Sequence, residues 1–329
     1  LKRLHQIMHY YTGKKFSFLY ISFHFEEIQQ ICSRAALMSE GNIDLIFEDE
    51  QVQKGVSNAL YLDYYNHVSN RVHHHIRTLG EEVLLVRDMS GRYLDHFRFR
   101  VYKGECLVIQ SLDTQLYKEI LEILKQEDGR LHADMVIRGK RVKGYASRQV
   151  AFLKEEPSQT MLFEHLSVRD NLCIALDGKL PCIWRKKKTQ KSVREEYARI
   201  FGEDIFDQYI HELTLEQRIN VVYMRILLEK PDVVFIVQPF KHAGTPHRLQ
   251  IWELLTLLLE RGIAIVILAM NMSDSLTVAD RVIRINRING KMVTKEFTQE
   301  QFTELPLYVP WVEFFDELEE KETADEEDM

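Results

Sequence analysis

The chain has 329 residues, of which 45% are apolar, and a formal net charge of −7. This length and composition can supply a substantial buried core, which favours a globular protein over a disordered one. The longest apolar run, residues 262–270, has the length of a buried strand and excludes a transmembrane helix, and the beginning of the sequence lacks the features of a secretory signal.

The charge is unevenly distributed along the chain. From Glu313 to Met329 there are ten acidic residues and one lysine, a local net charge of −9, so the remainder carries about +2. A nearly neutral body argues against a nucleic-acid-binding protein, and the acidic end is expected to be disordered. No C-x-x-C spacing joins the cysteines, which we expect to be reduced, as in a cytoplasmic protein: Cys32, Cys106, Cys173 and Cys182.

Four elements are expected in the first fifty residues. The apolar spacing in residues 1–8 predicts a helix, and residues 16–22, FSFLYIS, have the composition of a strand. A helical pattern that becomes strand-like covers residues 25–38, and the turn at 39–41 leads into a short strand at 42–49. These residues predict a helix, strand, helix, strand fragment.

Residues 51–80 are polar and aromatic and predict a linker. The run His73–His75 has no second cluster at the spacing of a metal site, so we expect these histidines to be exposed.

From Val83 onward, strands alternate with helices. Strands are predicted at residues 83–90, 96–110 (two strands joined at Lys103–Gly104), 134–142 (a hairpin turning at Gly139), 150–157, 231–239, 263–270 and 281–293 (a hairpin). Helices are predicted at 115–129, 247–262 and 273–280, and through most of 161–225, where the basic stretch 184–194 is expected to be a solvated loop. This alternation favours an α/β fold with a mainly parallel sheet covered on both faces, and the helical stretch favours a separate lobe.

Five stretches of this pattern are specific enough to suggest a family. They are the opening strands of residues 83–105, which end in Gly-Glu, and the stretches VAFLKEE, MLFEHLSVRDNL, LLEKPDVVFIVQPF and ADRVIRINRINGKMV. Together they resemble the nucleotide-binding cassette of ABC transporters, in particular the second cassette of the tandem ATPases that serve ribose- and galactose-type sugar importers. The resemblance covers residues 81–298. It implies a P-loop NTPase-like ABC cassette with a mainly parallel sheet, an antiparallel β subdomain and an inserted helical subdomain.

The resemblance also implies the domain boundaries. Residues 81–305 would form a degenerate second cassette, with its helical lobe at about 160–228, and residues 306–329 would form an aromatic segment and the acidic disordered tail. Residues 1–50 resemble the last strand, switch region and closing hairpin of a first cassette, and 51–80 would be the linker. The sequence leaves open whether the first cassette is missing from the gene or only from this chain.

The resemblance places four residues at the phosphate-binding loop, in the stretch SLDTQLYKE: Ser111, Gln115, Tyr117 and Lys118. The family's loop has the form G-x-x-x-x-G-K-[ST], in which backbone N–H groups converge on the phosphates. Here the stretch has no glycine, Tyr117 stands at the lysine position and Lys118 at the Ser/Thr position. A backbone without glycine does not readily adopt the conformations of a phosphate nest. We therefore expect no bound cofactor. The alternative is that ATP and Mg²⁺ bind at a rearranged site that uses Lys118.

The residues implied to act on the attacking water are also altered. Val237 stands where the family has the Asp of the Mg²⁺ shell, and Gln238 stands where a Glu polarises the water. Met270 lies at the position of the switch histidine, and Phe23 occupies the corresponding place in the first unit. We therefore expect no catalytic residue and no metal site.

The signature motif is the fourth altered element. The stretch LTLEQ stands where the family has L-S-G-G-Q, so Leu213, the hydroxyl of Thr214 and Gln217 are kept while both glycines are lost. Glu155 and Glu156, in the stretch VAFLKEE, are either remnants of the permease-facing segment or surface acids.

These patterns predict a cassette whose fold is retained while its ATP chemistry is lost. The expected function is that of a non-catalytic binding or structural subunit that pairs with an ABC permease or a second ABC cassette, in the cytoplasm or peripherally at the inner face of the cell membrane. Two alternatives stay open: a working sugar-transport ATPase with a rearranged ATP site, and a soluble regulator or scaffold derived from one.

Overall fold

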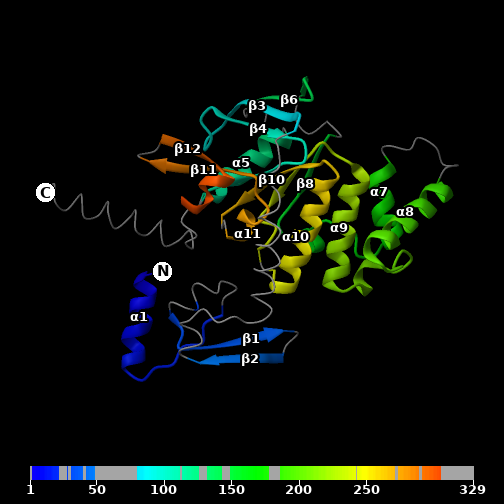
Figure 1. The fold of residues 1–329 in the computed structure, drawn as a ribbon. Coiled ribbons are helices and arrows are strands. Elements are labelled where there is room, and N and C mark those ends of the chain that lie inside the picture. The colour runs from blue at the N-terminus through cyan, green and yellow to red at the C-terminus, as the bar shows by residue number, and fades with distance from the viewer. Residues whose placement is uncertain are drawn as a thin grey trace.

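The computed structural model describes residues 2–21, 28, 31–39, 42–48, 80–111, 113–125, 132–142, 149–177, 186–241, 243–270, 273–288 and 291–304. Within these residues, two sheets and a set of helices form one body from residue 80 onward (Figure 1). None of the helices in the described ranges has the length and hydropathy needed to cross a membrane.

A six-stranded sheet lies at the centre of this body, with the strand order β12-β11-β5-β10-β9-β8. Its strands are β5 (Cys106–Gln110), β8 (Val150–Leu153), β9 (Val233–Val237), β10 (Ala264–Ala269), β11 (Arg281–Ile288) and β12 (Lys291–Thr298). All neighbours pair in parallel except β11 and β12, which form the predicted hairpin. Strands β5, β9 and β10 are buried throughout, which explains why they read as uninterrupted apolar runs.

A second, antiparallel sheet has the order β4-β3-β6-β7. It contains β3 (Glu82–Ser90), β4 (Phe97–Tyr102), β6 (His132–Ile137) and β7 (Lys140–Val142). The two strands expected on either side of Lys103–Gly104 therefore belong to different sheets. Gly104 makes this change of direction with a φ of +68°, and a Cβ atom there would lie 3.1 Å from the carbonyl oxygen of Leu259.

The helices are α5 (Thr114–Lys125), α6 (Pro157–Thr160), α7 (Val168–Asp177), α8 (Lys186–Phe201), α9 (Leu215–Glu229), α10 (Thr245–Glu260) and α11 (Ser273–Leu276), with 3₁₀ turns η3 (Ile210–Glu212) and η4 (Gln299–Glu304). The prediction of a basic loop was wrong in its described part, because the basic residues from Lys186 to Arg194 form the first half of α8. Lysine, glutamine and arginine have high helix propensity, so a run of them is compatible with an exposed helix.

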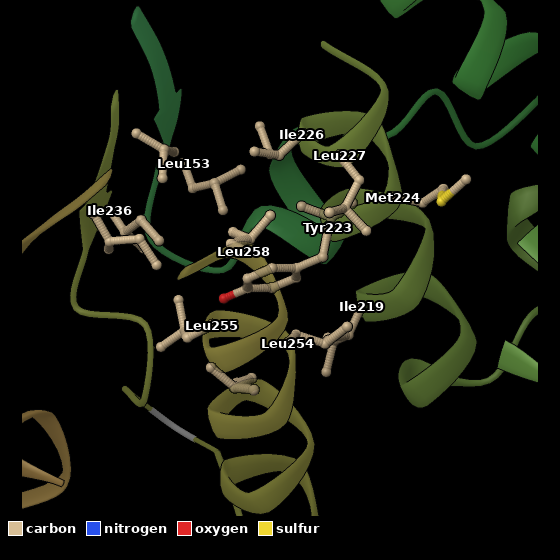
Figure 2. Close-up of a cluster of buried hydrophobic side chains, with 14 of the residues drawn as sticks. Leu153, Ile219, Tyr223, Met224, Ile226, Leu227, Ile236, Leu254, Leu255 and Leu258 are labelled. Atoms are coloured by element: carbon tan, nitrogen blue, oxygen red, sulfur yellow. The ribbon is translucent and has the colours of Figure 1, made fainter. Parts of the chain in front are cut away.

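Side chains on the two faces of the central sheet belong to two separate cores. In β9, Val234 and Ile236 point toward the core that contains α9 and α10, while Phe235 and Val237 point toward the core that contains α5 and the antiparallel sheet. Figure 2 shows the first of these cores, where Tyr223 of α9 lies among apolar side chains of α10 and Ile236. The sheet is thus covered on both faces, as the sequence predicts.

An ionic network joins the beginning of β5 to the hairpin β11–β12. Arg281 is buried and pairs with the carboxylates of Glu105 and Glu296, and it also donates to the carbonyl oxygen of Arg100 at 2.7 Å. Asp280 accepts a hydrogen bond from the backbone N–H of Cys106 at 2.8 Å. The Gly-Glu and Asp-Arg-Val stretches noticed in the sequence therefore meet in space and fix the closing hairpin against the sheet.

The first part of the chain contributes α1 (Lys2–Gly13) and the antiparallel hairpin of β1 (Arg34–Ser39) and β2 (Asn42–Glu48). Residues 16–21, expected to be a strand, are not in a strand, and the side chain of Leu19 is 93% exposed. A strand requires a hydrogen-bonded neighbour, and the described residues place none beside this segment. The helix predicted from residue 25 is described only at residues 28 and 31, which are helical. Phe23, Cys182 and residues 49–79 lie outside the described residues.

Candidate functional site

The carboxyl ends of four parallel strands meet at one edge of the central sheet. Strands β5, β10, β9 and β8 are neighbours in that order and lead directly into Ser111, Met270, Gln238 and Glu155. In open α/β sheets, ligands bind beyond this edge. The structure therefore brings the predicted phosphate-loop, catalytic-base and switch positions to one side of the sheet.

Tyr117 occupies the space between the end of β5 and the first turn of α5. Its hydroxyl accepts a hydrogen bond from the backbone N–H of Ser111 at 2.6 Å and donates toward the carbonyl oxygens of Ser111, at 2.5 Å, and Ala269. The side chain is only 3% exposed, and burial raises the pKa of the hydroxyl, so it stays protonated. The residue at the family's lysine position is thus an uncharged side chain fixed to backbone groups.

Asp113 accepts a hydrogen bond from the backbone in the first turn of α5. Its carboxylate accepts a hydrogen bond from the backbone N–H of Gln115 at 2.9 Å, and its own N–H donates to the Oγ of Ser111 at 3.2 Å. Free N–H groups at a helix start, together with the helix dipole, are what attract a phosphate. Here the carboxylate of Asp113 lies at the helix start and already accepts the hydrogen bond of one such N–H group.

The other two predicted phosphate-loop residues point to solvent. Gln115 and Lys118 are exposed on α5, whereas Tyr117, one position before Lys118, is buried. Neighbouring helical residues differ in direction by about 100° on a helix of 3.6 residues per turn, so Lys118 and Tyr117 cannot both face the strand ends.

Val237 and Gln238 have different environments although they are adjacent. Val237 is buried in the core beside α5, so its side chain is a packing group. Gln238 has a left-handed backbone with a φ of 44°, and its N–H still donates to the carbonyl oxygen of Leu268 at 2.9 Å. This conformation, which is uncommon for residues other than glycine, turns the chain out of β9.

Glu155 meets Gln238 across the ends of β8 and β9. One carboxylate oxygen of Glu155 accepts a hydrogen bond from Nε2 of Gln238 at 2.8 Å, and the other accepts from Nζ of Lys241 at 2.7 Å. The sequence left Glu155 undecided between a remnant and a surface acid, and it offered no reason to name Lys241. The signal lies in the register: Leu153 pairs with Ile236, so the residues two positions further on lie side by side.

Met270 packs at this edge as an apolar group. It is half-buried against the core that contains α5, and its carbonyl oxygen accepts a hydrogen bond from Nε2 of Gln110 at 3.2 Å. A thioether offers only a weak acceptor and no acid–base group.

The three predicted signature residues lie at the start of α9, in the helical lobe, and not at the strand ends. Leu213 is buried, Thr214 is the N-cap, and the Thr214 and Gln217 side chains each accept a hydrogen bond from the other residue's backbone N–H. The Nε2 of Gln217 also donates to Glu203 at 3.0 Å. This is a capping box that starts the helix with its own side chains.

The groups at the strand ends do not fit a bound ATP with Mg²⁺. A phosphate would need free N–H groups and a cation beside them, and a Mg²⁺ ion would need oxygen ligands at the ends of β9 or α5. In the described part of this edge, Tyr117 has no positive charge, Val237 has no oxygen, and the carboxylate of Asp113 is bonded to the N–H of Gln115. Also among the described residues, no group of three or more His, Cys, Asp or Glu is arranged to hold a metal ion.

Solved structures with the same architecture are ABC transporter cassettes. One is cbiO1 from Clostridium perfringens, part of the ABC transporter complex cbiONQ, with a TM-score of 0.56 and 15% identity over 69% of this chain and 92% of that one. Another is an ATP-binding cassette of an ABC transporter in its ADP conformation, with a TM-score of 0.54 and 14% identity over 68% and 94% of the two chains. The fold is therefore that of the α/β ABC cassette, with a mainly parallel sheet and an antiparallel β subdomain.

Curated proteins with related sequences are sugar-import ATP-binding proteins. The galactose/methyl galactoside import ATP-binding protein MglA of Clostridium tetani is 25% identical over 303 residues, and the ribose import ATP-binding protein RbsA 2 of Rhizobium meliloti is 26% identical over 302. Each alignment covers 86% of this chain and 58% of the relative. The chain spans about half the length of the curated relatives it matches, between 45% and 63%. No protein-family model matches the chain.

The fold is that of an ABC transporter ATP-binding cassette. Within this class, the chain is related at low identity to the ATP-binding proteins of ribose and galactose importers.

Proposed function

We propose that this chain is a non-catalytic cassette that acts as a binding or structural subunit of an ABC transporter. The observation that carries the proposal is the occupation of the phosphate-loop region by the chain's own groups. The Tyr117 hydroxyl is hydrogen-bonded to the backbone N–H and carbonyl oxygen of Ser111, and the Asp113 carboxylate accepts a hydrogen bond from the N–H of Gln115. A nucleotide phosphate would have to displace both, and it would meet the negative charge of Asp113.

The proposal extends to the lost general base. Gln238 can donate and accept hydrogen bonds but cannot remove a proton, a step that typically contributes a factor of about 10²–10⁴ in rate. Its amide is already engaged by Glu155. Lys118, which the alternative of a rearranged ATP site requires, is exposed, whereas the adjacent Tyr117 is buried.

The partners follow from the relatives. Those proteins are import ATP-binding proteins, so the proposed partners are an ABC permease or a second ABC cassette, with the chain in the cytoplasm at the inner face of the membrane. For a cassette without ATP chemistry, the helical lobe formed by α7, α8 and α9 would supply a docking surface. In this role the protein would position or stabilise a transporter whose energy comes from another cassette.

We also propose that residues 1–50 are the tail of a preceding cassette, joined by 51–80 to the cassette at 81–305. The order helix α1, apolar segment 16–21, hairpin β1–β2 repeats the order helix α10, strand β10, hairpin β11–β12 later in the chain. Alignments with the relatives that cover 86–92% of this chain extend beyond the second unit, which supports this division. The aromatic segment and acidic tail proposed for 306–329 lie outside the described residues.

The test is nucleotide binding and turnover by the purified full chain. We expect no heat of binding with Mg-ATP in calorimetry and no phosphate release, under conditions where an active sugar-import ATP-binding protein shows both. ATP turnover that disappears in Gln238→Ala would overturn the proposal. Tight Mg-ATP binding that disappears in Lys118→Ala would instead establish the rearranged site, and absence of a permease from pull-downs of the full chain would favour a soluble regulator.

A further inference from the structure

The ends of β8 and β9 carry a charged cluster in which Glu155 bonds to Gln238 and Lys241. The parallel register pairs Leu153 with Ile236, and beyond it Glu155 lies beside Gln238. Both oxygens of the Glu155 carboxylate are engaged, one by the Gln238 amide at 2.8 Å and one by the Lys241 ammonium at 2.7 Å. One carboxylate thereby joins two strands whose residues are far apart in the sequence.

The backbone on both sides of this cluster is held in an uncommon conformation. Glu156 has a φ of 48° and Gln238 a φ of 44°, both in the left-handed region. Residues other than glycine persist there only when the surrounding structure fixes them. The turn after β9 is further fixed by the hydrogen bond from the Lys241 N–H to the Gln238 carbonyl oxygen at 3.0 Å.

The segment that begins at Glu155 leads from the sheet into the helical lobe. It forms the short helix α6, and at its far end the carbonyl oxygen of Met161 accepts a hydrogen bond from Arg225 of α9. The Thr160 hydroxyl binds back to the carbonyl oxygens of Glu155 and Glu156 at 3.2 and 3.1 Å. Residues 155–161 are therefore tied to β9 at one end and to the helical lobe at the other.

We propose that Glu155, Gln238 and Lys241 form a clasp that holds residues 155–161, and with them the start of the helical lobe, in a fixed position against β9 without a nucleotide. The inference rests on the proposed function in one respect, namely that the strand ends are closed by protein groups and not by ATP. It adds a structural property of this edge: residues 155–161 keep their position against β9 only while the clasp is formed.

Hydrogen–deuterium exchange on the full chain tests the clasp. In Glu155→Ala, we expect amide exchange in residues 155–163 to accelerate about tenfold, the size of effect expected for losing charge-assisted hydrogen bonds at a half-exposed site. Residues 281–288 of β11 serve as the internal reference. The matched control is Glu156→Ala, because its carboxylate is adjacent and has no role in the clasp, and its exchange should stay within about twofold of the wild type.

An exchange of partners gives the sharper test. Gln238→Glu places a second carboxylate against Glu155 and should open the clasp, whereas the double variant Glu155→Gln with Gln238→Glu restores an amide–carboxylate pair and should recover most of the protection. High salt should weaken the clasp in the wild type and have less effect in Glu155→Ala.

The outcomes separate the two proposals. Unchanged exchange in Glu155→Ala, or acceleration equal to that of β11, would overturn the clasp, as would failure of the double variant to recover protection in a chain that keeps wild-type exchange in β11. ATP turnover by a chain that shows the expected exchange behaviour would overturn the non-catalytic function and leave the clasp supported.

Discussion

The Tyr117 hydroxyl lies 2.6 Å from the amide nitrogen and 2.5 Å from the carbonyl oxygen of Ser111. These backbone groups belong to the turn that leads from β5 into α5, which is where the cassette fold would receive a phosphate. The contact is therefore a packing feature that also engages the backbone groups of this turn.

Removal of the Tyr117 hydroxyl should destabilise the protein. In Tyr117→Phe, the buried N–H of Ser111 loses an acceptor, and the carbonyl oxygens of Ser111 and Ala269 lose the single O–H that lies between them, so we expect the free energy of unfolding to fall by about 1–3 kcal/mol. Chemical denaturation measures this change. Tyr117→Lys should not produce Mg-ATP binding in calorimetry, because Asp113 and the glycine-free turn remain; recovery of binding in that variant would contradict the account of this site.

Asp113 should contribute to stability as a helix cap. Asp113→Ala leaves the N–H of Gln115 without its carboxylate, and we expect a loss of about 1 kcal/mol. Gln115→Ala, which changes an exposed side chain in the same turn, is the control and should change stability by less than about 0.5 kcal/mol. Thermal denaturation of the two variants compares them directly, and equal stability of both would rule out the cap.

Arg281 should be among the residues whose loss is most damaging. Arg281→Ala leaves the buried Glu105 carboxylate without its ion pair, which typically costs about 3–5 kcal/mol. Arg100→Ala removes an arginine whose side chain is exposed and lies 4.0 Å from Glu82, so its effect should stay below about 1 kcal/mol. Urea unfolding measures both, and similar losses in the two variants would show that the buried network is not what holds the closing hairpin.

Gly91 and Glu119 should be energetically coupled. The Glu119 carboxylate accepts hydrogen bonds from the backbone N–H groups of Arg92, Tyr93 and Leu94, and a Cβ atom on Gly91 would clash with its carboxyl group. Gly91→Ala should therefore destabilise the wild type by about 2 kcal/mol through overpacking. In a Glu119→Ala background the same substitution should cost less than about 0.5 kcal/mol. Additive effects in this double-mutant cycle would exclude the contact.

Much of the fold could be predicted from the sequence, because apolar periodicity is a local signal. The uninterrupted apolar runs at 233–237 and 264–269 predict buried parallel strands, and both are interior strands of the sheet with parallel neighbours on each side. The separation of β4 from β5 was not predicted, because adjacent strands in the sequence give no sign of the sheet to which each belongs. The expected strand at 16–22 is not formed in its described part, residues 16–21, because its pairing depends on neighbours that the local pattern does not contain.

At the candidate site, too, some features follow from the sequence and others only from the tertiary structure. The sequence by itself determined which residue types stand at these positions: the turn has no glycine, Val237 has no oxygen to offer a metal ion, and Gln238 has no carboxylate to remove a proton. Only the tertiary structure decided which groups meet at this edge of the sheet. Tyr117 meets Ala269, and Glu155 meets Gln238, because strands distant in the sequence are brought into parallel register, and that register places their ends side by side.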